Sequence, residues 1–294
     1  MQRRASLLLG FKLWHDRPLT QVLRDERLQL AGAPGADHDA LQFDPEDPAL
    51  LRASAVGGAI RPTDMLQLRD DLDRLAWLRQ PLPGGLWRAG QLEARYRLLQ
   101  RPGGGCQLGL GPDEDGRWWR LGAFADAQAA RRGAASLRLY LRGVDQACEG
   151  LHVVEHVLLR PLHREASRHA KLRLAPGFYR LQVTALLPAW TQRTAQPAFR
   201  RFARETLRIS CPAHLALHTL WLGAAPMGQF ETVLAAWLEA RRDWCQRPDD
   251  NDAQRATDER ACQLIELLLA ADETLARAWT QEDDGGEPVV QGHA

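Results

Sequence analysis

Apolar and polar positions follow the clearest pattern in the second half of the chain. Residues alternate from Tyr179 to Leu187, which predicts a strand with one buried face. A helix is expected to begin at Pro197, where a first-turn proline is favoured, and to end before Pro212. Its inner stripe is predicted to comprise Phe199, Phe202, Ala203 and Thr206. A second strand is expected within residues 213–222, with Leu215, Leu217 and Trp221 on one face.

Two further helices are predicted after this second strand. The first is expected to open at Pro226, and its inner stripe comprises Phe230, Val233, Leu234, Trp237 and Leu238. A polar break at residues 247–252 separates it from a long helix. The apolar residues in phase along that helix are Ala261, Leu264, Ile265, Leu268, Leu275 and Trp279. The resulting β-α-β-α order buries one face of each element against a small sheet.

A small strand-strand-helix module is expected before this domain. Residues near 96–100 alternate, and Gln107–Leu110 can pair with Arg117–Leu121 through the glycine- and aspartate-rich turn at 111–116. An alanine-rich helix follows, and its buried face is predicted to comprise Ala127, Ala130, Ala134, Leu137 and Leu141.

The fold class predicted from these patterns is α+β. Residues 1–90 form a mixed or helical amino-terminal region, with a loop at 31–48 and a helix starting at Pro62. Residues 91–165 form the small α+β module, and 166–280 form the β-α-β-α domain with its terminal helix. Residues 281–294 are expected to be a disordered tail.

Composition removes several classes of function. The formal net charge of the 294 residues is +1, so no bulk charge favours nucleic acid or an anionic membrane. The five cysteines are scattered and have no CxxC spacing, which is typical of reduced thiols in a cytoplasmic protein. Lys12 interrupts the apolar stretch near the start, and no segment reaches transmembrane length. We therefore expect a cytoplasmic protein.

One motif suggests metal chemistry. His152-Val153-Val154-Glu155-His156 matches the H-x-x-E-H signature of zinc peptidases. On a helix, both imidazoles would share a face and hold one zinc ion, and Glu155 would act as general base. A third ligand would come from Glu231 or Glu205. The residues around the motif also resemble the metal helix of pitrilysin-type peptidases.

The same motif has a second interpretation. Val153, Val154 and Val157 are β-branched and suit a strand about as well as a helix. On a strand, Glu155 would point away from the histidines and the metal site would not form. The sequence shows neither a nucleophile elbow nor a Walker loop. We therefore predict no enzyme activity, cofactor or metal, and retain the zinc set as the alternative.

Two blocks of spaced residues carry a resemblance to a known family. The first is Glu155-His156 followed by Leu158-Leu159-Arg160-Pro161. The second block contains Pro188, Trp190, Phe199, Arg200, Glu205, Pro212, His214, Trp221, Phe230 and Trp237. Together they resemble baseplate-associated structural proteins of phage-tail-like contractile injection systems. The resemblance covers roughly residues 93–245, and the first 90 residues lie outside it.

This resemblance implies that the named residues are architectural. Arg160 is expected to pair with Glu155, and Arg200 with Glu205. The three tryptophans would anchor the core or an interface, and Pro188 and Pro212 would fix the ends of elements. The implied function is a structural subunit that contacts other subunits of such a particle and does not bind nucleic acid or insert into a membrane. A zinc metallopeptidase-like protein is the first alternative, and a free-standing adaptor is the second.

Overall fold

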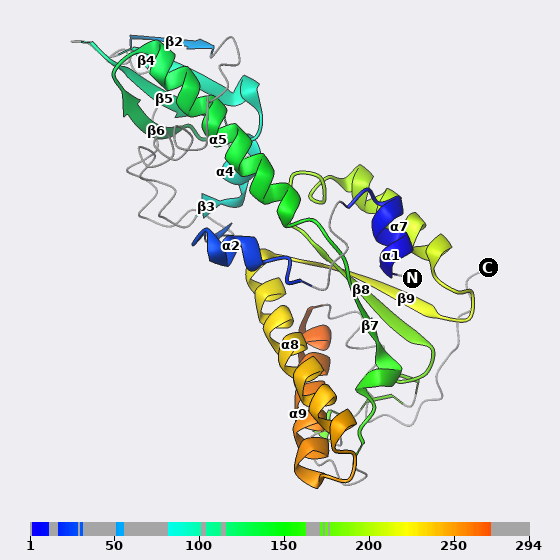
Figure 1. The fold of residues 1–294 in the computed structure, drawn as a ribbon. Helices are drawn as coiled ribbons and strands as arrows, with labels where there is room; N and C mark the ends of the chain where they lie inside the picture. The colour runs from blue at the N-terminus through cyan, green and yellow to red at the C-terminus, as the bar shows by residue number, and fades with distance from the viewer. Residues whose placement is uncertain are drawn as a thin grey trace.

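The computed structural model describes residues 2–11, 17–28, 30–31, 51–55, 82–100, 104–112, 116–162, 171–172, 174–175 and 177–271. Within these ranges the protein has the predicted α+β architecture (Figure 1). The helix expected from Pro62, the apolar positions Leu275 and Trp279, and the tail at 281–294 lie outside the described residues. The proposed domain boundaries stay predictions.

The first sheet has four antiparallel strands in the order β2-β4-β5-β6. Their bounds are Leu51–Ala55 (β2), Tyr96–Gln100 (β4), Cys106–Leu110 (β5) and Trp119–Phe124 (β6). The predicted hairpin is confirmed, with Leu110 of β5 opposite Trp119 of β6. Gly111 opens the turn at φ +151°, and a Cβ there would lie 2.8 Å from the Arg117 carbonyl oxygen.

Several short elements precede and follow β2. The helices are α1 (Gln2–Leu8), α2 (Gln21–Asp25) and α4 (Gly84–Ala89), and η3 (Glu93–Arg95) is a 3-10 turn. β1 (Leu30–Ala31) pairs in parallel with β3 (Leu82–Pro83).

Helix α5 (Ala127–Ala147) crosses the first sheet and continues toward the second (Figure 1). Asp126 caps its amino terminus, because its carboxylate accepts a 2.8 Å hydrogen bond from the Ala129 amide. The predicted inner face is buried at Ala130, Ala134, Leu137 and Leu141, and Ala127 packs at its edge. The small residues let the helix approach the sheet closely.

The second sheet contains β7 (His152–Glu155), β8 (Gln182–Pro188) and β9 (Ala216–Leu222). β7 is antiparallel to β8, and β8 is parallel to β9. The parallel pair requires a crossover, which α7 (Pro197–Ser210) supplies. A 3-10 turn, η4 (His156–Leu159), directly follows β7.

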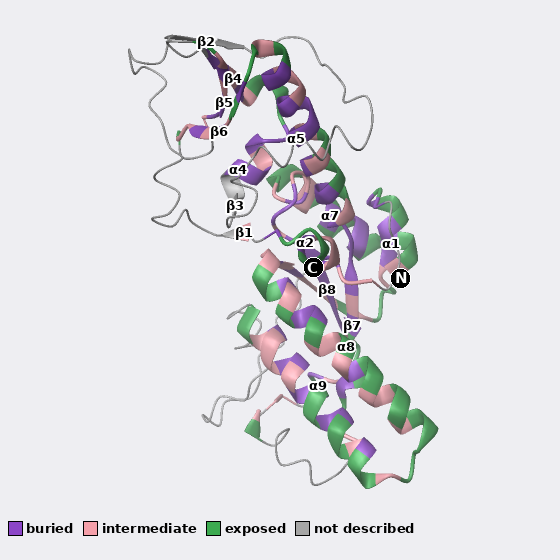
Figure 2. Ribbon diagram, turned by 60° about the vertical axis from the view of Figure 1, so that its left-hand side comes forward, coloured by how far each residue is buried: buried purple, intermediate pink, exposed green. Residues whose placement is uncertain are grey.

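Helices cover both faces of the second sheet. Alternation along the strands sends Leu151, Ala185 and Leu187 into one apolar cluster with α1 and α7. The intervening residues Val154 and Leu186 enter the larger cluster, which contains α8 (Ala224–Gln246) and α9 (Asn251–Ala271). Figure 2 shows buried positions along the strands and exposed positions on the outer sides of these helices. The predicted β-α-β-α order is confirmed. The prediction that β8 has one buried face was wrong, because helices cover both faces of the sheet and every residue from Val183 to Leu187 is buried.

Three predicted element starts were wrong. β8 begins at Gln182, because Leu181 has a positive φ of +54° and its side chain is 59% exposed. β9 begins at Ala216, so Leu215 precedes the strand. Helix α8 begins at Ala224, and Pro226 lies within its first turn, where a missing amide costs no hydrogen bond. Leu238, predicted on its inner stripe, is exposed.

The predicted inner face of α7 is confirmed at Phe199, Ala203 and Thr206 and was wrong at Phe202. Phe202 is 53% exposed, whereas Ala203, Thr206, Leu207 and Ser210 are buried. Ala203 and Leu207 share a cluster with Ala185 and Leu187 of β8. The small Ala203 allows α7 to lie close to the strand, and this leaves the larger phenylalanine outside.

Candidate functional site

The H-x-x-E-H segment does not form a helix. His152 and Glu155 lie on strand β7, and His156 begins the 3-10 turn after it. Alternation along a strand turns His152 and Glu155 to opposite faces, and Glu155 is exposed while His152 is buried. The helical arrangement required by the zinc interpretation is therefore wrong for this segment.

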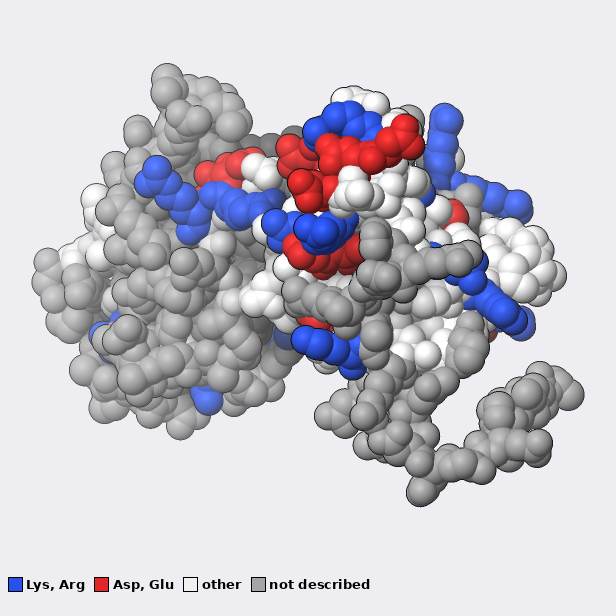
Figure 3. Space-filling view, turned by 90° about the horizontal axis from the view of Figure 1, so that it is seen from below, with Lys and Arg blue, Asp and Glu red and all other residues white. Residues whose placement is uncertain are grey.

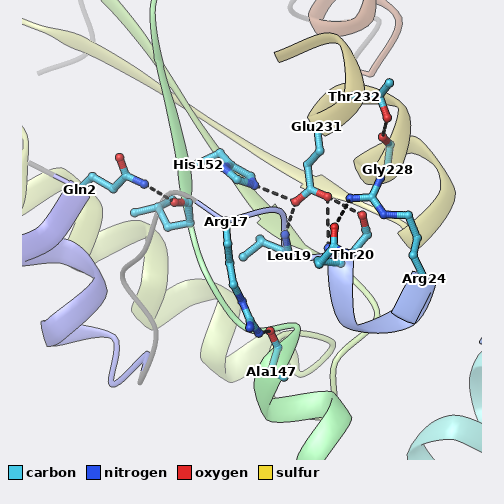
Figure 4. Close-up of polar contacts among 12 residues, drawn as sticks. Gln2, Arg17, Leu19, Thr20, Arg24, Ala147, His152, Gly228, Glu231 and Thr232 are labelled. Atoms are coloured by element: carbon cyan, nitrogen blue, oxygen red, sulfur yellow. Dashed lines mark hydrogen bonds and ion pairs between the residues drawn. The ribbon is translucent and has the colours of Figure 1, made fainter. Parts of the chain in front are cut away.

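A buried polar site joins His152 to Glu231 of α8 (Figure 4). His152 Nε2 lies 2.8 Å from Glu231 Oε1, and the glutamate is only 3% exposed. The same carboxylate accepts hydrogen bonds from the Leu19 amide, from the Thr20 amide at 3.1 Å, and from the Thr20 hydroxyl. Glu231 thus connects a strand, a helix and an amino-terminal turn.

Hydrogen bonds keep the Glu231 carboxylate ionised although it is buried. Burial alone would raise the pKa of Glu231, but the bonds from His152 and Thr20 together outweigh it and hold the pKa below its usual range. Glu231 is therefore ionised near neutral pH, and His152 Nε2 donates to it. The Phe230 ring packs beside the imidazole with the ring centroids 5.8 Å apart. The hydrogen bonds to Glu231 compensate for the burial of its charge.

His156 occupies a second, separate buried site. Its Nδ1 lies 3.0 Å from the Phe178 carbonyl oxygen, and its Nε2 lies 2.8 Å from the Thr184 hydroxyl. Burial lowers the pKa of His156 to about 4, so the ring is neutral at pH 7. Nδ1–H then donates to the carbonyl, and Nε2 accepts from Thr184. The lone pair that a metal would need is already engaged.

The structure therefore brings together only His152 and Glu231 of the proposed zinc set. Glu205 lies on α7, on the other side of the sheet from His152, and is exposed. Among the described residues no group of three or more His, Cys, Asp or Glu side chains is placed to hold a metal ion. A zinc peptidase needs three protein ligands and a water, and this arrangement does not supply them.

The aromatic residues of the family resemblance belong mostly to the core. Trp190, Phe230 and Trp237 are buried in the larger cluster, and Phe199 and Trp221 pack at the edge of the smaller one. No exposed group of tryptophans marks an interface at these positions.

The prolines of the resemblance lie at or near the ends of elements. Pro188 is the last residue of β8, paired with Leu222, and Pro161 follows η4 closely. Pro212 follows α7, and both it and His214 are exposed. Pro188 and Pro212 therefore lie at the ends of elements.

Neither expected arginine–glutamate pair forms. Arg200 donates through Nε to the Thr194 carbonyl at 2.8 Å, and its guanidinium lies 5.0 Å from the centre of the Trp221 ring. Glu205 instead lies 3.5 Å from Arg208, one turn further along α7. Within the described part of the chain no ion pair joins Arg160 to Glu155. Arg200 orders the β8–α7 connection by capping carbonyls and covering a tryptophan.

A second arginine organises the same region and was missed from the sequence. Arg193 makes a two-pronged contact with Glu149, at 3.0 Å and 2.5 Å, and donates to the Leu9 carbonyl at 2.8 Å. Its guanidinium also lies about 5 Å from the rings of Phe11 and Phe199. Arg193 therefore joins α1 to the second sheet. No motif marks this contact, because its partners are 44 and 184 positions away.

A second buried carboxylate, Asp145 of α5, was also missed. It accepts hydrogen bonds from the Trp87 indole at 2.6 Å and from the Gln192 amide at 3.0 Å. Burial raises the pKa of Asp145, and the opposing hydrogen bonds do not cancel this effect. The pKa values of Asp145 and Glu231 thus shift in opposite directions, because Glu231 has more donors and an imidazole beside it.

The remaining feature with functional meaning is an exposed apolar row on α7. Phe202 and Ile209 are 53% and 70% exposed, and they lie seven positions apart on one side of the helix. Leu7 and Leu8 of α1 are also exposed, on the same side of the second sheet. Large apolar side chains in water mark an interaction surface when they cluster.

No protein-family model matches this chain, and no curated protein matches it. Among the described residues, no helix is long and apolar enough to cross a membrane.

Proposed function

We propose that this chain is a structural subunit that acts by binding other proteins, and that the assembly is a phage-tail-like contractile injection system. We place it near the baseplate, because the resemblance that supports this assignment is to baseplate-associated proteins. The residues that carry the resemblance fall on β7, β8, β9, α7, α8 and the connections between them. A shared pattern made of core residues and element ends indicates a shared fold rather than a shared reaction.

The exposed row of α7 supports a binding role most directly. A helix of 14 residues keeps Phe202 and Ile209 in water although its opposite side is already packed on the sheet. Such exposure contributes nothing to the stability of the isolated chain. It becomes favourable when a partner covers the row, and a phenylalanine at the centre of such a contact is a strong anchor.

The buried polar groups support the same conclusion. Glu231, His152 and His156 each have protein partners that account for their charge and hydrogen bonds. A catalytic group would need access to substrate, whereas these side chains lie between packed elements. Their role in this proposal is to hold the sheet, α8 and the amino-terminal turn in fixed positions.

Two alternatives remain distinct from this proposal. A zinc metallopeptidase-like protein is favoured only by the His152–Glu231 contact. The Glu231 carboxylate in that contact already accepts hydrogen bonds from two backbone amides and a hydroxyl. A free-standing adaptor would use the same exposed surfaces without a particle. The first alternative differs in metal content, and the second differs in the size of the native complex.

The test is sedimentation of native particles from cells that make this chain. We expect the chain to co-sediment with sheath and tube proteins, and to stay with them after extensive washing. Recovery only in small complexes without sheath or tube would favour the adaptor. Stoichiometric zinc in the purified chain, lost in His152→Ala and Glu231→Gln but kept in His214→Ala, would instead favour the peptidase.

A further inference from the structure

Helix α7 presents three different rows of side chains. The row facing the sheet is buried and contains Ala203, Thr206, Leu207 and Ser210. Beside it, Ala198, Phe202, Glu205 and Ile209 recur at helical spacing and are all exposed. We call this second set the apolar row, because Glu205 is its only charged member. The third set is basic and lies next to it.

The basic row consists of Arg201, Arg204 and Arg208, all exposed. Arg208 lies 3.5 Å from Glu205, and that pair is largely in solvent. Within the described ranges, neither Arg201 nor Arg204 has an acidic partner. The pKa of Arg200 is lowered by burial and by the nearby Arg204, which agrees with a local excess of positive charge.

This imbalance is a property of α7 and does not extend over the whole protein. The net charge of the chain is only +1. Figure 3 views the molecule from the α8–α9 end and shows basic and acidic residues interspersed there. Several pairs in that region are neutralised within one helix or turn, such as Arg247 with Asp250 at 2.8 Å. The unbalanced arginines of α7 therefore indicate a negatively charged partner.

We propose that the apolar and basic rows of α7 form the binding site for an acidic amphipathic helix of a neighbouring subunit. This inference rests on the proposed function as an assembly subunit, and it identifies the chemistry of the partner. Phe202 and Ile209 are about 10 Å apart along the helix axis, because each residue adds about 1.5 Å. Apolar side chains at positions i and i+7 of a partner helix have the same spacing.

The geometry favours a helix over an extended strand. Every backbone group in the middle of α7 is bonded within the helix, so α7 offers no open edge for strand pairing. Recognition must then use side chains, which is how helices pack ridge into groove. Carboxylates on the partner helix would meet Arg201, Arg204 and Arg208. Arginine suits this role because its planar group binds a carboxylate through two hydrogen bonds.

Three other occupants fit these rows less well. A second copy would bring an identical set of arginines against Arg201 and Arg204, and like charges would repel. Nucleic acid would use the arginines but would leave Phe202 and Ile209 without an apolar partner. An anionic membrane requires a wide apolar face that inserts into the lipid, whereas Glu205 lies between the two large apolar residues of the row.

The test is photo-cross-linking of the full chain in its native assembly. Ile209 is replaced by photoreactive benzoylphenylalanine, and Glu259, an exposed residue of α9, is replaced in the same way as the matched control. We expect a cross-link from position 209, stronger than any from position 259, to a helical segment with excess Asp and Glu in another subunit. Peptide mapping of the product identifies that segment.

Charge variants of the cross-linking chain make the test specific. Arg201→Glu with Arg204→Glu should lower the yield of the cross-linked product about ten-fold, whereas Arg201→Lys with Arg204→Lys should retain most of it. Both residues are exposed, so the two double variants should have unfolding midpoints close to that of the parent chain. Thermal unfolding followed by circular dichroism checks this before the cross-linking.

Each remaining outcome overturns the proposal. Two of these outcomes concern the product: a cross-link to a second copy, lipid or nucleic acid, and a cross-link to a segment without acidic residues. The other two concern the yield of cross-linked product: a yield unaffected by charge reversal, and a yield at position 209 no higher than at position 259. Failure here is distinguishable from failure of the proposed function. If only the α7 binding site is wrong, the chain would still co-sediment with sheath and tube proteins. If the chain cross-links to an acidic helix but does not co-sediment with these proteins, only the assignment to a phage-tail-like particle is wrong.

Discussion

The carboxylate of Glu231 lies 2.8 Å from the imidazole of His152, although the two residues are 79 positions apart in the sequence. Glu231 also accepts hydrogen bonds from Leu19 and Thr20, so three segments converge on a single ionised side chain. A buried charge is tolerated only when its hydrogen-bonding capacity is filled, and here four donors fill it. The pair is therefore a structural junction of the fold.

Replacing Glu231 by glutamine tests this junction. The amide keeps the size of the side chain but loses the charge, and its NH₂ group cannot accept from the amides or from Thr20. We expect the free energy of unfolding at pH 7 to fall by about 2 kcal/mol, the usual scale for buried bonds to a charged acceptor. Urea unfolding measures this change. Glu239→Gln on the exposed side of α8 should change the value by less than about 0.5 kcal/mol, and an equal loss there would contradict the argument.

The contribution of Glu231 should depend on pH in a defined direction. Its pKa is lower in the folded chain than in the unfolded chain, so its stabilisation is present above the unfolded value of about 4.3. That stabilisation is lost as the pH falls through the lower folded pKa. The difference in unfolding free energy between the wild type and Glu231→Gln should therefore shrink as the pH falls below about 4. A difference that stays as large at pH 3 as at pH 5 would contradict the assigned charge.

His156 should make the fold sensitive to milder acid. Its pKa is about 4 in the folded chain and 6.5 for an unperturbed histidine, so at pH 5 only the unfolded chain binds the proton. Stability is then fully present above pH 6.5 and falls as the pH drops toward 4, by up to about 3 kcal/mol. Denaturant unfolding at pH 7, 6, 5 and 4 measures this slope. His156→Gln should remove most of it, whereas the exposed His214→Gln should leave it unchanged.

The periodic patterns predicted most elements of the described fold because apolar residues recur along them at the spacing of a strand or a helix. Strand alternation located β8 and β9, and helical spacing located α5, α7 and α8. The choice of inner face on α7 was harder, because apolar residues occur in two adjacent rows. Only the close approach to β8 decides that Ala203 faces inward and Phe202 outward.

The polar sites were much less predictable than the strands and helices. The pattern at 152–156 correctly drew attention to two histidines, but it placed them in one site, whereas the structure puts them in two. Glu231 was named as a partner for the wrong reason, as a metal ligand. Its actual partners include the backbone amides of Leu19 and Thr20, and backbone donors leave no signal in the sequence.

Two glycines on α5 should respond oppositely to alanine. A Cβ at Gly133 would lie 2.5 Å from the Phe124 ring of β6, whereas a Cβ at Gly143 meets nothing within 4 Å. Gly133→Ala requires the buried Phe124 ring or the helix to shift and should cost about 1–3 kcal/mol. Gly143→Ala should instead stabilise the chain by up to about 1 kcal/mol, because alanine restricts the unfolded chain and favours helix. Thermal unfolding compares the two, and equal signs would contradict the placement of α5.

The contact between Arg193 and Glu149 leads to a prediction about the amino terminus. Arg193 holds Glu149 through two hydrogen bonds, donates to the Leu9 carbonyl and covers Phe11. Lysine keeps the charge but lacks the planar fork, so Arg193→Lys should lose the paired geometry and the stacking. We expect a loss of about 1 kcal/mol in unfolding free energy, concentrated at α1, because Arg193 holds the end of α1 together with a small apolar cluster and the Gln2–Leu151 hydrogen bond.

Amide hydrogen exchange locates that loss. Exchange at residues 5–11 should become several-fold faster in Arg193→Lys, because local opening of α1 becomes less costly by about 1 kcal/mol. Exchange in α9 should stay unchanged, since that helix lies on the other side of the sheet. Arg201→Lys, an exposed substitution on α7, should leave both regions unaffected. Faster exchange spread evenly over the chain would mean that Arg193 stabilises the whole fold and does not specifically attach α1.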